Sequence, residues 1–578
     1  MPGASGSPSA EHAATAPDQY GGSARQKLFG RAFYESIGSP KLILAPMVEQ
    51  SEFAWRMLTR SFMSPSTSKN LLAYTPMFHS RMFTDTPKYR ESHFQPLKTT
   101  LPSPPDTYHA SQYTDADMYL DGNPAIDRPL FVQFCSNSPE DLLQAAHHVA
   151  PFCDAVDLNL GCPQGIARRG HYGAFLQEDW DLVYKLIDRL HTELAVPVTA
   201  KMRILETREK TLEYAKTILS AGASIITVHG RQRDQKGHAT GLADWSVIKY
   251  LRDNLPPDTV VFANGNILTY GDIEQCLQAT GADGVMSAEG NLYDPSIFAE
   301  PPPVGSEGRE YWRGRDGKGG YRMDAVMRRY MDIIHRYILG QAPPARPPLF
   351  LPSDAISTEH DSTSAPAATN APPCQPKSHT RPEDSDQLEG PPSKKQKQKN
   401  SKPQGKQEKV TSPNLTAMQP HLFHLLRPLV SKHIPVRDAL ARCRAGDLPA
   451  FEHVLSLVED AVKQGLLAYE ADAAAFETAP PEEAAADEKL DESSVRTVAR
   501  VKRPWWVCQP YVRPLPKEAL AKGALSLTKK QKKRMEDEQA REEAEAKAVG
   551  LTPGGKVEAE VEARGQTVEI PKEGLVCG

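Results

Sequence analysis

The stretch PVTAKMRILETREKTLEYAKTILSAGASIITVHG, residues 197–230, has the pattern of one strand–helix–strand unit. PVTAKMRI (197–204) and SIITVHG (224–230) are short apolar runs of strand length, and a helical pattern covers Glu209–Ala221 between them. Two strands joined by a helical crossover lie parallel in one sheet. The stretch therefore predicts a parallel sheet covered by helices.

The same alternation continues on both sides of this unit. Six further apolar runs complete a set of eight: LILAPM (42–47), LLAYTPM (71–77), LFVQFCS (130–136), AVDLNLG (155–161), VVFANGN (260–266) and GVMSAEG (284–290). Eight such units over about 260 residues match a (β/α)8 TIM barrel in number and length. A doubly wound sheet is the alternative, but no GxGxxG motif follows the first strand.

Composition divides the rest of the chain. An apolar fraction of 39% and 50 prolines in 578 residues indicate that part of it lies outside any packed core. We expect a helical domain formed by two segments, because helical periodicity appears on both sides of a proline- and lysine-rich insert. The expected parts are a disordered segment at 1–40, the barrel at 41–300, the helical domain at 310–340 and 415–470, a disordered linker at 341–414 and a charged, largely disordered tail at 471–578.

Charge and cysteine content exclude several classes of protein. A net charge of −5 is a small imbalance, and the eight cysteines include no CxxC pair. We therefore expect neither a disulfide scaffold nor a metal site, and a reducing compartment. No stretch approaches the ~20 apolar residues that span a membrane. The expected protein is an intracellular monomer, in the cytoplasm or the nucleus, with no membrane partner.

Polar side chains stand at the carboxyl ends of the predicted strands, where TIM barrels hold their chemistry. Gln133 and Asn159 are amides suited to the pyrimidine edge of a flavin, and Lys201 supplies a cation for its anionic reduced form. Glycine-containing loops after the seventh and eighth strands suit a phosphate. Cys162 follows the fourth strand, between Gly161 and Pro163, and is either a small buried apolar residue or a thiol presented to a ligand.

Longer motifs at the same strand ends resemble those of the tRNA-dihydrouridine synthases, in particular the eukaryotic type that acts at D-loop positions 16 and 17. The matching stretches lie between residues 42 and 298 and include LAPMVEQSEFAWRMLTR, PLFVQFCSNSP, DAVDLNLGCPQGIARRGHYGAFL, VTAKMRI, ITVHGRQRDQKG, FANGNI and GADGVMSAEGNLYDP. The resemblance implies an FMN-containing barrel that uses NADPH, or NADH, to reduce the C5–C6 bond of tRNA uridines.

The resemblance also implies roles for single residues. Cys162 becomes the proton donor to uracil C5 after hydride transfer from flavin N5 to C6, which suits a thiol with an ordinary pKa of about 8.5. The flavin contacts, together with the amide Asn159, fall on Ala45, Pro46, Met47, Gln133, Lys201, His229, Asn264, Gly265, Asn266, Ala288 and Glu289.

A tRNA substrate requires cations for its phosphates. The candidates are Arg168, Arg169, Arg231, Arg233 and Lys236 at the barrel mouth and Arg322, Arg328, Arg329 and Arg336 on the helix expected at 310–339. Two other functions remain open. One is a flavin oxidoreductase acting on a free pyrimidine, similar to dihydroorotate dehydrogenases. The other is an RNA-binding barrel without catalysis.

Overall fold

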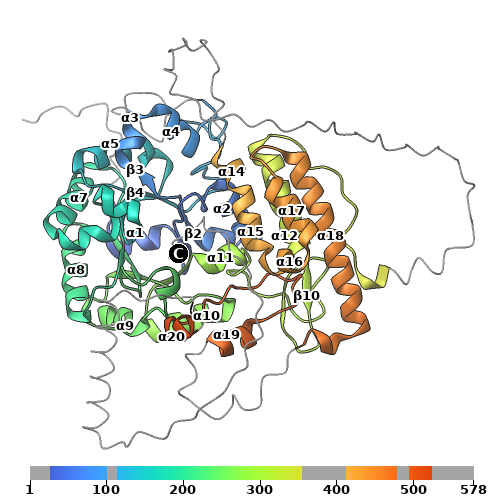
Figure 1. Ribbon diagram of the computed structural model, residues 1–578. Helices are drawn as coiled ribbons and strands as arrows, with labels where there is room; N and C mark the ends of the chain where they lie inside the picture. The colour runs from blue at the N-terminus through green and yellow to red at the C-terminus, as the bar shows by residue number, and fades with distance from the viewer. Residues whose placement is uncertain (1–26, 100–112, 355–411, 478–493, 522, 524–578) are drawn as a thin grey trace, which may run out of the picture.

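The computed structural model describes residues 27–99, 113–354, 412–477, 494–521 and 523 (Figure 1). Its centre is a barrel of eight parallel strands, which confirms the fold predicted from the sequence. The strands are β1 (Leu42–Leu44), β2 (Leu71–Tyr74), β4 (Leu130–Cys135), β5 (Ala155–Leu160), β6 (Val198–Arg203), β7 (Ile225–His229), β8 (Val260–Asn264) and β9 (Gly284–Ser287). Neighbouring strands pair in chain order, and the pairings of β1 with β9 and of β2 with β4 close the ring.

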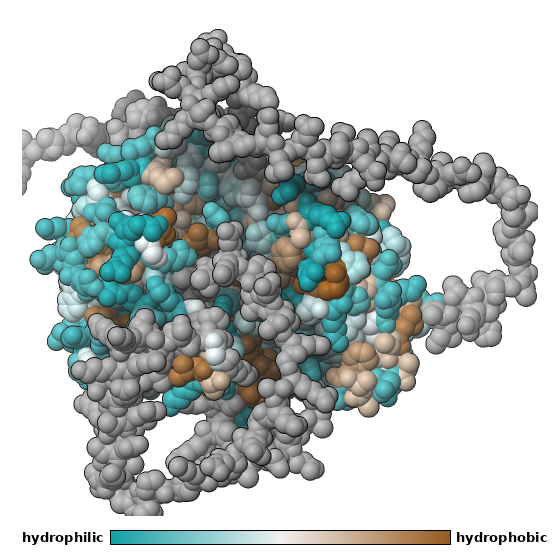
Figure 2. Space-filling view, viewed as in Figure 1, coloured by the Kyte–Doolittle hydropathy of each residue, from teal (hydrophilic) through white to brown (hydrophobic). Residues whose placement is uncertain are grey.

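Helices form the outer layer of the barrel. The main ones are α5 (Pro139–Val149), α7 (Trp180–Glu193), α8 (Arg208–Ser220), α9 (Trp245–Asn254) and α10 (Tyr270–Thr280). The side chains of Ser138, Asp179, Thr207 and Asp244 accept backbone N–H groups at the starts of the first four helices. These caps fix where each loop after a strand ends. The outward faces of α7 and α8 are predominantly hydrophilic, as amphipathic helices on a barrel require (Figure 2).

The segment before β1 closes the amino-terminal end of the barrel. Helix α1 (Gly30–Ser36) buries Tyr34, and Arg31 pairs with Asp283 at 2.6 Å, just before β9. Lys27 donates to the carbonyl oxygens of His191 and Leu194 at 2.7 and 2.9 Å. The expectation of a disordered segment at 1–40 is therefore wrong for residues 27–40, and residues 1–26 lie outside the described part.

The insertion between β2 and β4 folds over one side of the barrel mouth. It contains β3 (Phe78–His79), α3 (Ser80–Asp85) and α4 (Pro87–His93), and β3 pairs with the end of β4. Arg56, on α2 (Phe53–Arg60), is fully buried and donates to Asp121 at 2.8 Å and to Asp127 at 2.6 Å. This paired buried cation holds the end of the insertion against the first barrel helix.

The helical domain lies beside the barrel, on the α2 and α11 (Glu289–Tyr293) side (Figure 1). Its helices are α12 (Met323–Ile333), α14 (Pro413–Thr416), α15 (Met418–Leu425), α16 (Arg427–Lys432), α17 (Ile434–Arg442) and α18 (Leu448–Ala471). The two segments expected from the sequence thus pack together, and the Asp447 side chain caps α18 by accepting the Ala450 N–H. Trp55 of α2 stacks on His421 of α15 at 3.9 Å between ring centres, and His421 contacts Glu52 at 3.0 Å. These contacts join domain and barrel.

Two segments expected to be disordered are partly packed. Within the linker 341–414, Leu349 is buried and Arg346 pairs with Glu452 of α18 at 2.8 Å. Within the tail 471–578, Trp506 is fully buried, and its carbonyl oxygen accepts the Met323 N–H at 2.9 Å. The expectation of disorder is wrong for these parts, and residues 355–411, 478–493, 522 and 524–578 lie outside the described residues.

We call residues 494–521 the C-terminal strap. It contains α19 (Ser494–Val501) and α20 (Pro516–Ala521), whose ends meet where Glu518 accepts the Ser494 N–H at 3.1 Å. Between them the chain packs on an unpredicted hairpin, β10 (Tyr311–Arg313) and β11 (Gly319–Tyr321), with Cys508 N–H donating to the Tyr321 carbonyl at 2.9 Å. From there the strap returns to the mouth of the barrel.

Candidate active site

The carboxyl ends of the barrel strands bring the predicted flavin contacts to one mouth. Ala45 and Met47 follow β1 and are almost completely buried, Gln133 lies on β4 and Asn159 on β5. The remaining predicted contacts follow in strand order: Lys201 on β6, His229 on β7, Asn264, Gly265 and Asn266 at the end of β8, and Ala288 and Glu289 after β9. The barrel thus assembles residues from across 245 positions of sequence only because its strands are parallel.

A chain of hydrogen bonds links the barrel interior to the cysteine loop. Asp157 is fully buried and accepts from Thr199 Oγ1 at 2.6 Å and from Gln133 Nε2 at 2.8 Å. Gln133 Oε1 in turn accepts from Asn159 Nδ2 at 2.8 Å. Asn159 Oδ1 then accepts the backbone N–H of Cys162 at 2.9 Å. Each amide is therefore held in one orientation.

Asp157 was not among the residues singled out from the sequence. Burial raises the pKa of its carboxyl group to about 6, against the hydrogen bonds from Thr199 and Gln133 and the charge of Lys201. The available signal was an acidic residue in a short apolar run, two positions before Asn159 and therefore on the same face of the strand.

Cys162 lies in a small cluster of buried side chains beside the mouth. Its side chain is 6% exposed and packs with Cys135, Ala167 and Tyr172. Gly173, at φ +65°, lies directly against it, since a Cβ there would be 2.8 Å from the Cys162 carbonyl oxygen. The glycine of the HYGAFL motif is thus required by the close approach of the two loops. Lys236 Nζ donates to the Pro163 carbonyl at 2.7 Å and ties a third loop to this one.

Lysine and histidine stand on the next two strands along the mouth, β6 and β7. Lys201 Nζ donates to Asn264 Oδ1 at 3.0 Å, and Asn264 Nδ2 donates to the Met286 carbonyl at 3.0 Å. Burial, together with the charges of Arg203, Lys201 and Arg231, holds the pKa of His229 well below its usual value. His229 is therefore neutral, and its Nε2 lies 3.2 Å from Arg231 Nη1, which can only donate. The ring proton then belongs on Nδ1.

The loop after β8 makes a tight turn. Gly265 has φ +117°, and a Cβ there would lie 2.5 Å from the Ala243 side chain. Asn266 follows at φ +63°, and its Oδ1 accepts from the Ala243 N–H at 2.8 Å and from Arg231 Nη2 at 2.9 Å. After β9, a Cβ on Gly290 would lie 2.3 Å from the Ile267 carbonyl oxygen. The two loops therefore meet backbone to backbone, which suits a phosphate group.

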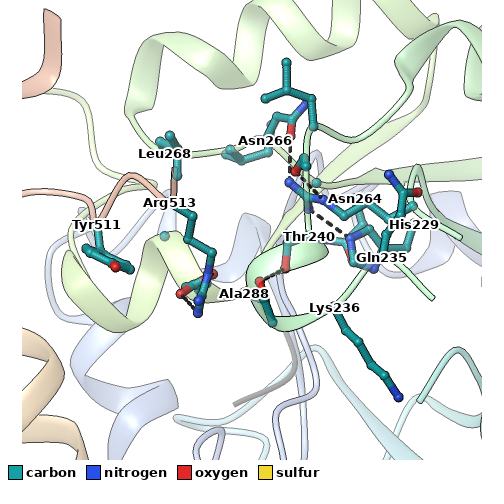
Figure 3. Close-up of a pocket in the computed structure, with 18 of the residues that line it drawn as sticks. His229, Gln235, Lys236, Thr240, Asn264, Asn266, Leu268, Ala288, Tyr511 and Arg513 are labelled. Carbon is teal, nitrogen blue, oxygen red and sulfur yellow. Dashed lines mark hydrogen bonds and ion pairs between the residues drawn. The ribbon is translucent and has the colours of Figure 1, made fainter. Parts of the chain in front are cut away.

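A cavity of about 690 Å³ opens between these loops (Figure 3). Its wall includes His229, Arg231 and the loops of Asn264–Asn266 and Ala288–Gly290. Gln164–Ile166, next to Cys162, line another side, and residues 511–515 of the C-terminal strap complete the wall. Gln133, Asn159, Cys162 and Lys201 stand outside this lining.

The arginines expected to bind RNA at the barrel mouth fall into three groups. Arg168 and Arg169 are exposed on α6 (Gly165–Gly170), beside the mouth. Arg233 pairs with Glu178 at 2.7 Å and stacks over Phe175. Arg231 belongs to the cavity and donates to Asn266 and to the Gly241 carbonyl, so the structure places it at the predicted flavin contacts.

The helical arginines are less accessible than expected. Arg322 is 2% exposed and pairs with Asp324 at 2.5 Å, so its assignment to an RNA surface is wrong. The helix begins after Arg322, and the Phe350 carbonyl of the packed linker accepts from its guanidinium at 2.7 Å. Arg328 pairs with Glu459 and Arg329 with Glu310, while Arg336 is exposed.

The described residues contain neither a metal centre nor a membrane span. No group of three or more His, Cys, Asp or Glu side chains in this part of the chain is arranged to hold a metal ion. Within the same residues, no helix is long and apolar enough to cross a membrane.

Comparison with known proteins agrees with this geometry. Residues 43–310 match the family model of the dihydrouridine synthases (Dus). The tRNA-dihydrouridine(16/17) synthase of Schizosaccharomyces pombe is 39% identical over 493 residues, which are 85% of this chain and 92% of the relative. The Saccharomyces cerevisiae protein of the same name is 40% identical over 85% of this chain and 88% of its own length. The family model covers the barrel, and the yeast relative also aligns with most of the rest of the chain. The chain therefore belongs to the dihydrouridine synthase family.

Proposed function

We propose that this protein is a flavin-dependent tRNA-dihydrouridine synthase that uses NADPH or NADH to reduce uridines 16 and 17 of the tRNA D-loop. The observation that carries the proposal is the hydrogen-bonded chain from Asp157 to the backbone of Cys162 at the barrel mouth. The yeast relatives named for this activity and for NAD(P)+ support it, since they match most of the chain.

The residues at the mouth fit a flavin mononucleotide. Two oriented amides, Gln133 and Asn159, suit the pyrimidine edge, and Lys201 suits the side that becomes negative on reduction. The loops after β8 and β9 border the cavity, and their small residues and backbone suit a phosphate at this end of the site. When bound, the flavin would supply the hydride for uracil C6.

The chain itself must supply a proton at C5. Hydride addition at C6 converts the C4 carbonyl into an enolate whose negative charge is shared between O4 and C5. C5 then takes a proton from a general acid. Cys162 is the acid in this proposal, because the loop after β5 holds it at the mouth and Asn159 fixes its backbone. Neutral His229 can donate from Nδ1 without adding a charge that would compete with Lys201.

A tRNA substrate would bind mainly through its phosphates. The exposed candidates are Arg168, Arg169 and Lys236 beside the mouth and Arg336 on the helical domain. The target base must leave its stack to reach Cys162, at a cost of a few kcal/mol that is smallest in a loop.

The test uses the purified full chain. Transfer RNA that lacks dihydrouridine is incubated without oxygen with the protein and NADPH, and mass spectrometry locates the product. We expect dihydrouridine at positions 16 and 17 from the wild type. Cys162→Ala should retain its flavin and lose turnover by about 10²- to 10⁴-fold, the usual share of general acid catalysis.

The same preparation separates the alternatives. A flavin that NADPH reduces but tRNA does not reoxidise would contradict the proposal and favour a free pyrimidine as substrate. A wild-type protein that binds tRNA and no flavin would favour an RNA-binding barrel. A Cys162→Ala variant that loses its flavin would assign Cys162 a structural role.

A further inference from the structure

The C-terminal strap contributes a wall to a cavity whose other walls are barrel loops. Tyr511 and Arg513 of the strap face the Ala288–Gly290 loop across this cavity (Figure 3). Arg513 donates to Glu289 through Nε at 3.1 Å and through Nη2 at 2.5 Å. A residue more than two hundred positions away in sequence thus reaches the turn predicted to hold a phosphate.

Cations outnumber carboxylates around the cavity as a whole. Arg203, Arg231, Lys236 and Arg513 line it, and Glu289 is the carboxylate among the lining residues described. Burial and repulsion from Arg203 lower the pKa of Arg231 to about 10, with Glu289 opposing this and Arg513 adding to it. The arginines therefore repel one another, and a dianion between them would relieve that repulsion.

The strap is held in place by contacts remote from the cavity. Trp506 is fully buried against Trp312, and Arg503 Nε donates to the Gly319 carbonyl at 2.6 Å. The side chain of Arg500 lies 3.5 Å from Asp272 on α10. Arg513 is therefore presented by a segment that is anchored independently of Glu289, so its guanidinium can change partners without the strap leaving.

We propose that Arg513 binds the phosphate monoester of the flavin mononucleotide, which makes the C-terminal strap part of the cofactor site. A guanidinium presents two parallel N–H donors that match two phosphate oxygens as well as they match a carboxylate. Arg513 would then exchange one oxygen of Glu289 for the phosphate, beside Arg231 and the backbone of the Gly265 turn. The inference rests on the proposed function, since it requires the flavin to lie in this mouth.

The experiment compares FMN with riboflavin, which lacks the phosphate. Full-length apoprotein is titrated with each compound by fluorescence quenching. Arg513→Ala should weaken FMN binding about 10- to 100-fold, the range of a hydrogen bond to a charged group, and leave riboflavin binding within about twofold. The FMN affinity of Arg513→Lys should fall between those of the wild type and Arg513→Ala, because lysine keeps the positive charge but lacks the two parallel N–H donors. The matched control is Arg500→Ala, which removes an arginine from the same strap away from the cavity and should change neither constant.

A second variant tests the exchange of partners. Glu289→Gln keeps the backbone of the loop and releases Arg513, so FMN should bind as tightly as or more tightly than in the wild type. Weaker FMN binding by Glu289→Gln would overturn the exchange. Equal FMN affinity in wild type and Arg513→Ala, or an equal loss for FMN and riboflavin, would overturn the phosphate contact.

Two other phosphate sources give different results. If Arg513 bound the 2′-phosphate of NADPH, Arg513→Ala would raise the KM for NADPH. The KM for NADH and the affinity for FMN would both stay unchanged. If it bound a tRNA phosphate, the variant would weaken tRNA binding and reduce its salt dependence at unchanged FMN affinity. Either result overturns the inference and leaves the proposed function standing, whereas a wild-type apoprotein that binds neither flavin contradicts the proposed function itself.

Discussion

Gln133 donates through Nε2 to the carboxylate of Asp157 at 2.8 Å, from one barrel strand to the next. This contact turns the Gln133 carbonyl oxygen toward Asn159, which carries the orientation on to the Cys162 loop. A fully buried acid thus sets the direction of an amide at the mouth. In metal sites, a hydrogen bond from a neighbouring residue fixes the orientation of each ligand; Asp157 does the same for the amide of Gln133.

The buried acid gives stability a distinct pH dependence. The pKa of Asp157 is raised from 3.8 to about 6 in the folded protein, so the folded state holds a proton that the unfolded state has lost between these values. The contribution of Asp157 to the free energy of unfolding is therefore largest below pH 4. It falls by roughly 3 kcal/mol as the pH rises to about 6 and above.

Asp157→Asn removes this titration. We expect the difference in unfolding free energy, variant minus wild type, to rise in favour of the variant between pH 4 and pH 6 and to be flat above pH 7. Urea unfolding at a series of pH values measures it, and subtraction cancels the groups common to both proteins. A difference that is constant across the series would contradict the raised pKa.

Lys201 should control the redox potential of a bound flavin. Lys201→Met keeps the length of the side chain and removes the cation beside Asn264, so the anionic reduced flavin loses stabilisation. We expect a more negative potential and slower reduction by NADPH. Equilibrium titration with a redox dye reports the potential independently of turnover. Lys210→Met, on the outside of α8, is the matched control and should leave the potential unchanged.

Much of the site follows from the sequence because a parallel barrel maps strand order directly onto the mouth. Apolar runs predicted the strands, and the polar residues near the end of each run predicted what stands at the mouth, as with Lys201 and Asn264. Arg322 shows where that reasoning stops. Helical periodicity placed it on a polar face, whereas the helix begins after it and the packed linker covers it.

The C-terminal strap could not be placed from the sequence. Its local signal is the aromatic pair Trp505–Trp506 in a charged tail, which predicts burial and says nothing of the partner. The partners of the strap are a hairpin of three-residue strands and the loop after β9. Such contacts depend on tertiary packing, and Arg513 therefore had no predictable role.

The joint between the helical domain and the barrel should depend on one buried pair. His421 and Glu52 lie 3.0 Å apart and are at most 3% exposed. His421→Ala leaves the Glu52 carboxylate buried without this partner, and we expect a loss of about 3–5 kcal/mol in unfolding free energy. Asp438→Ala breaks the exposed pair with Arg437 and should cost about 0–1 kcal/mol. Similar losses for the two variants would show that the domains are joined by apolar packing alone.

The arginines beside the mouth should make tRNA binding sensitive to salt. Arg168 and Arg169 are exposed on α6, next to the Cys162 loop, so a polyanion that enters the mouth must pass them. Replacing both by alanine removes up to two phosphate contacts. The slope of log affinity against log salt concentration should then become shallower by about one to two, since each contact releases close to one counterion.

Filter binding between 50 and 300 mM salt measures this slope. Arg189→Ala on α7 is the control. Arg189 is exposed and pairs with Glu193 near the end of that helix. This position is close to the carbonyl groups that Lys27 contacts at the amino-terminal end of the barrel, away from the mouth. Its slope should match that of the wild type. Because the proposed function gives the proton transfer to Cys162 and only phosphate contacts to these arginines, turnover at saturating tRNA should survive the double substitution while the apparent affinity falls. An unchanged slope with reduced turnover would instead mean that Arg168 and Arg169 position the flipped base.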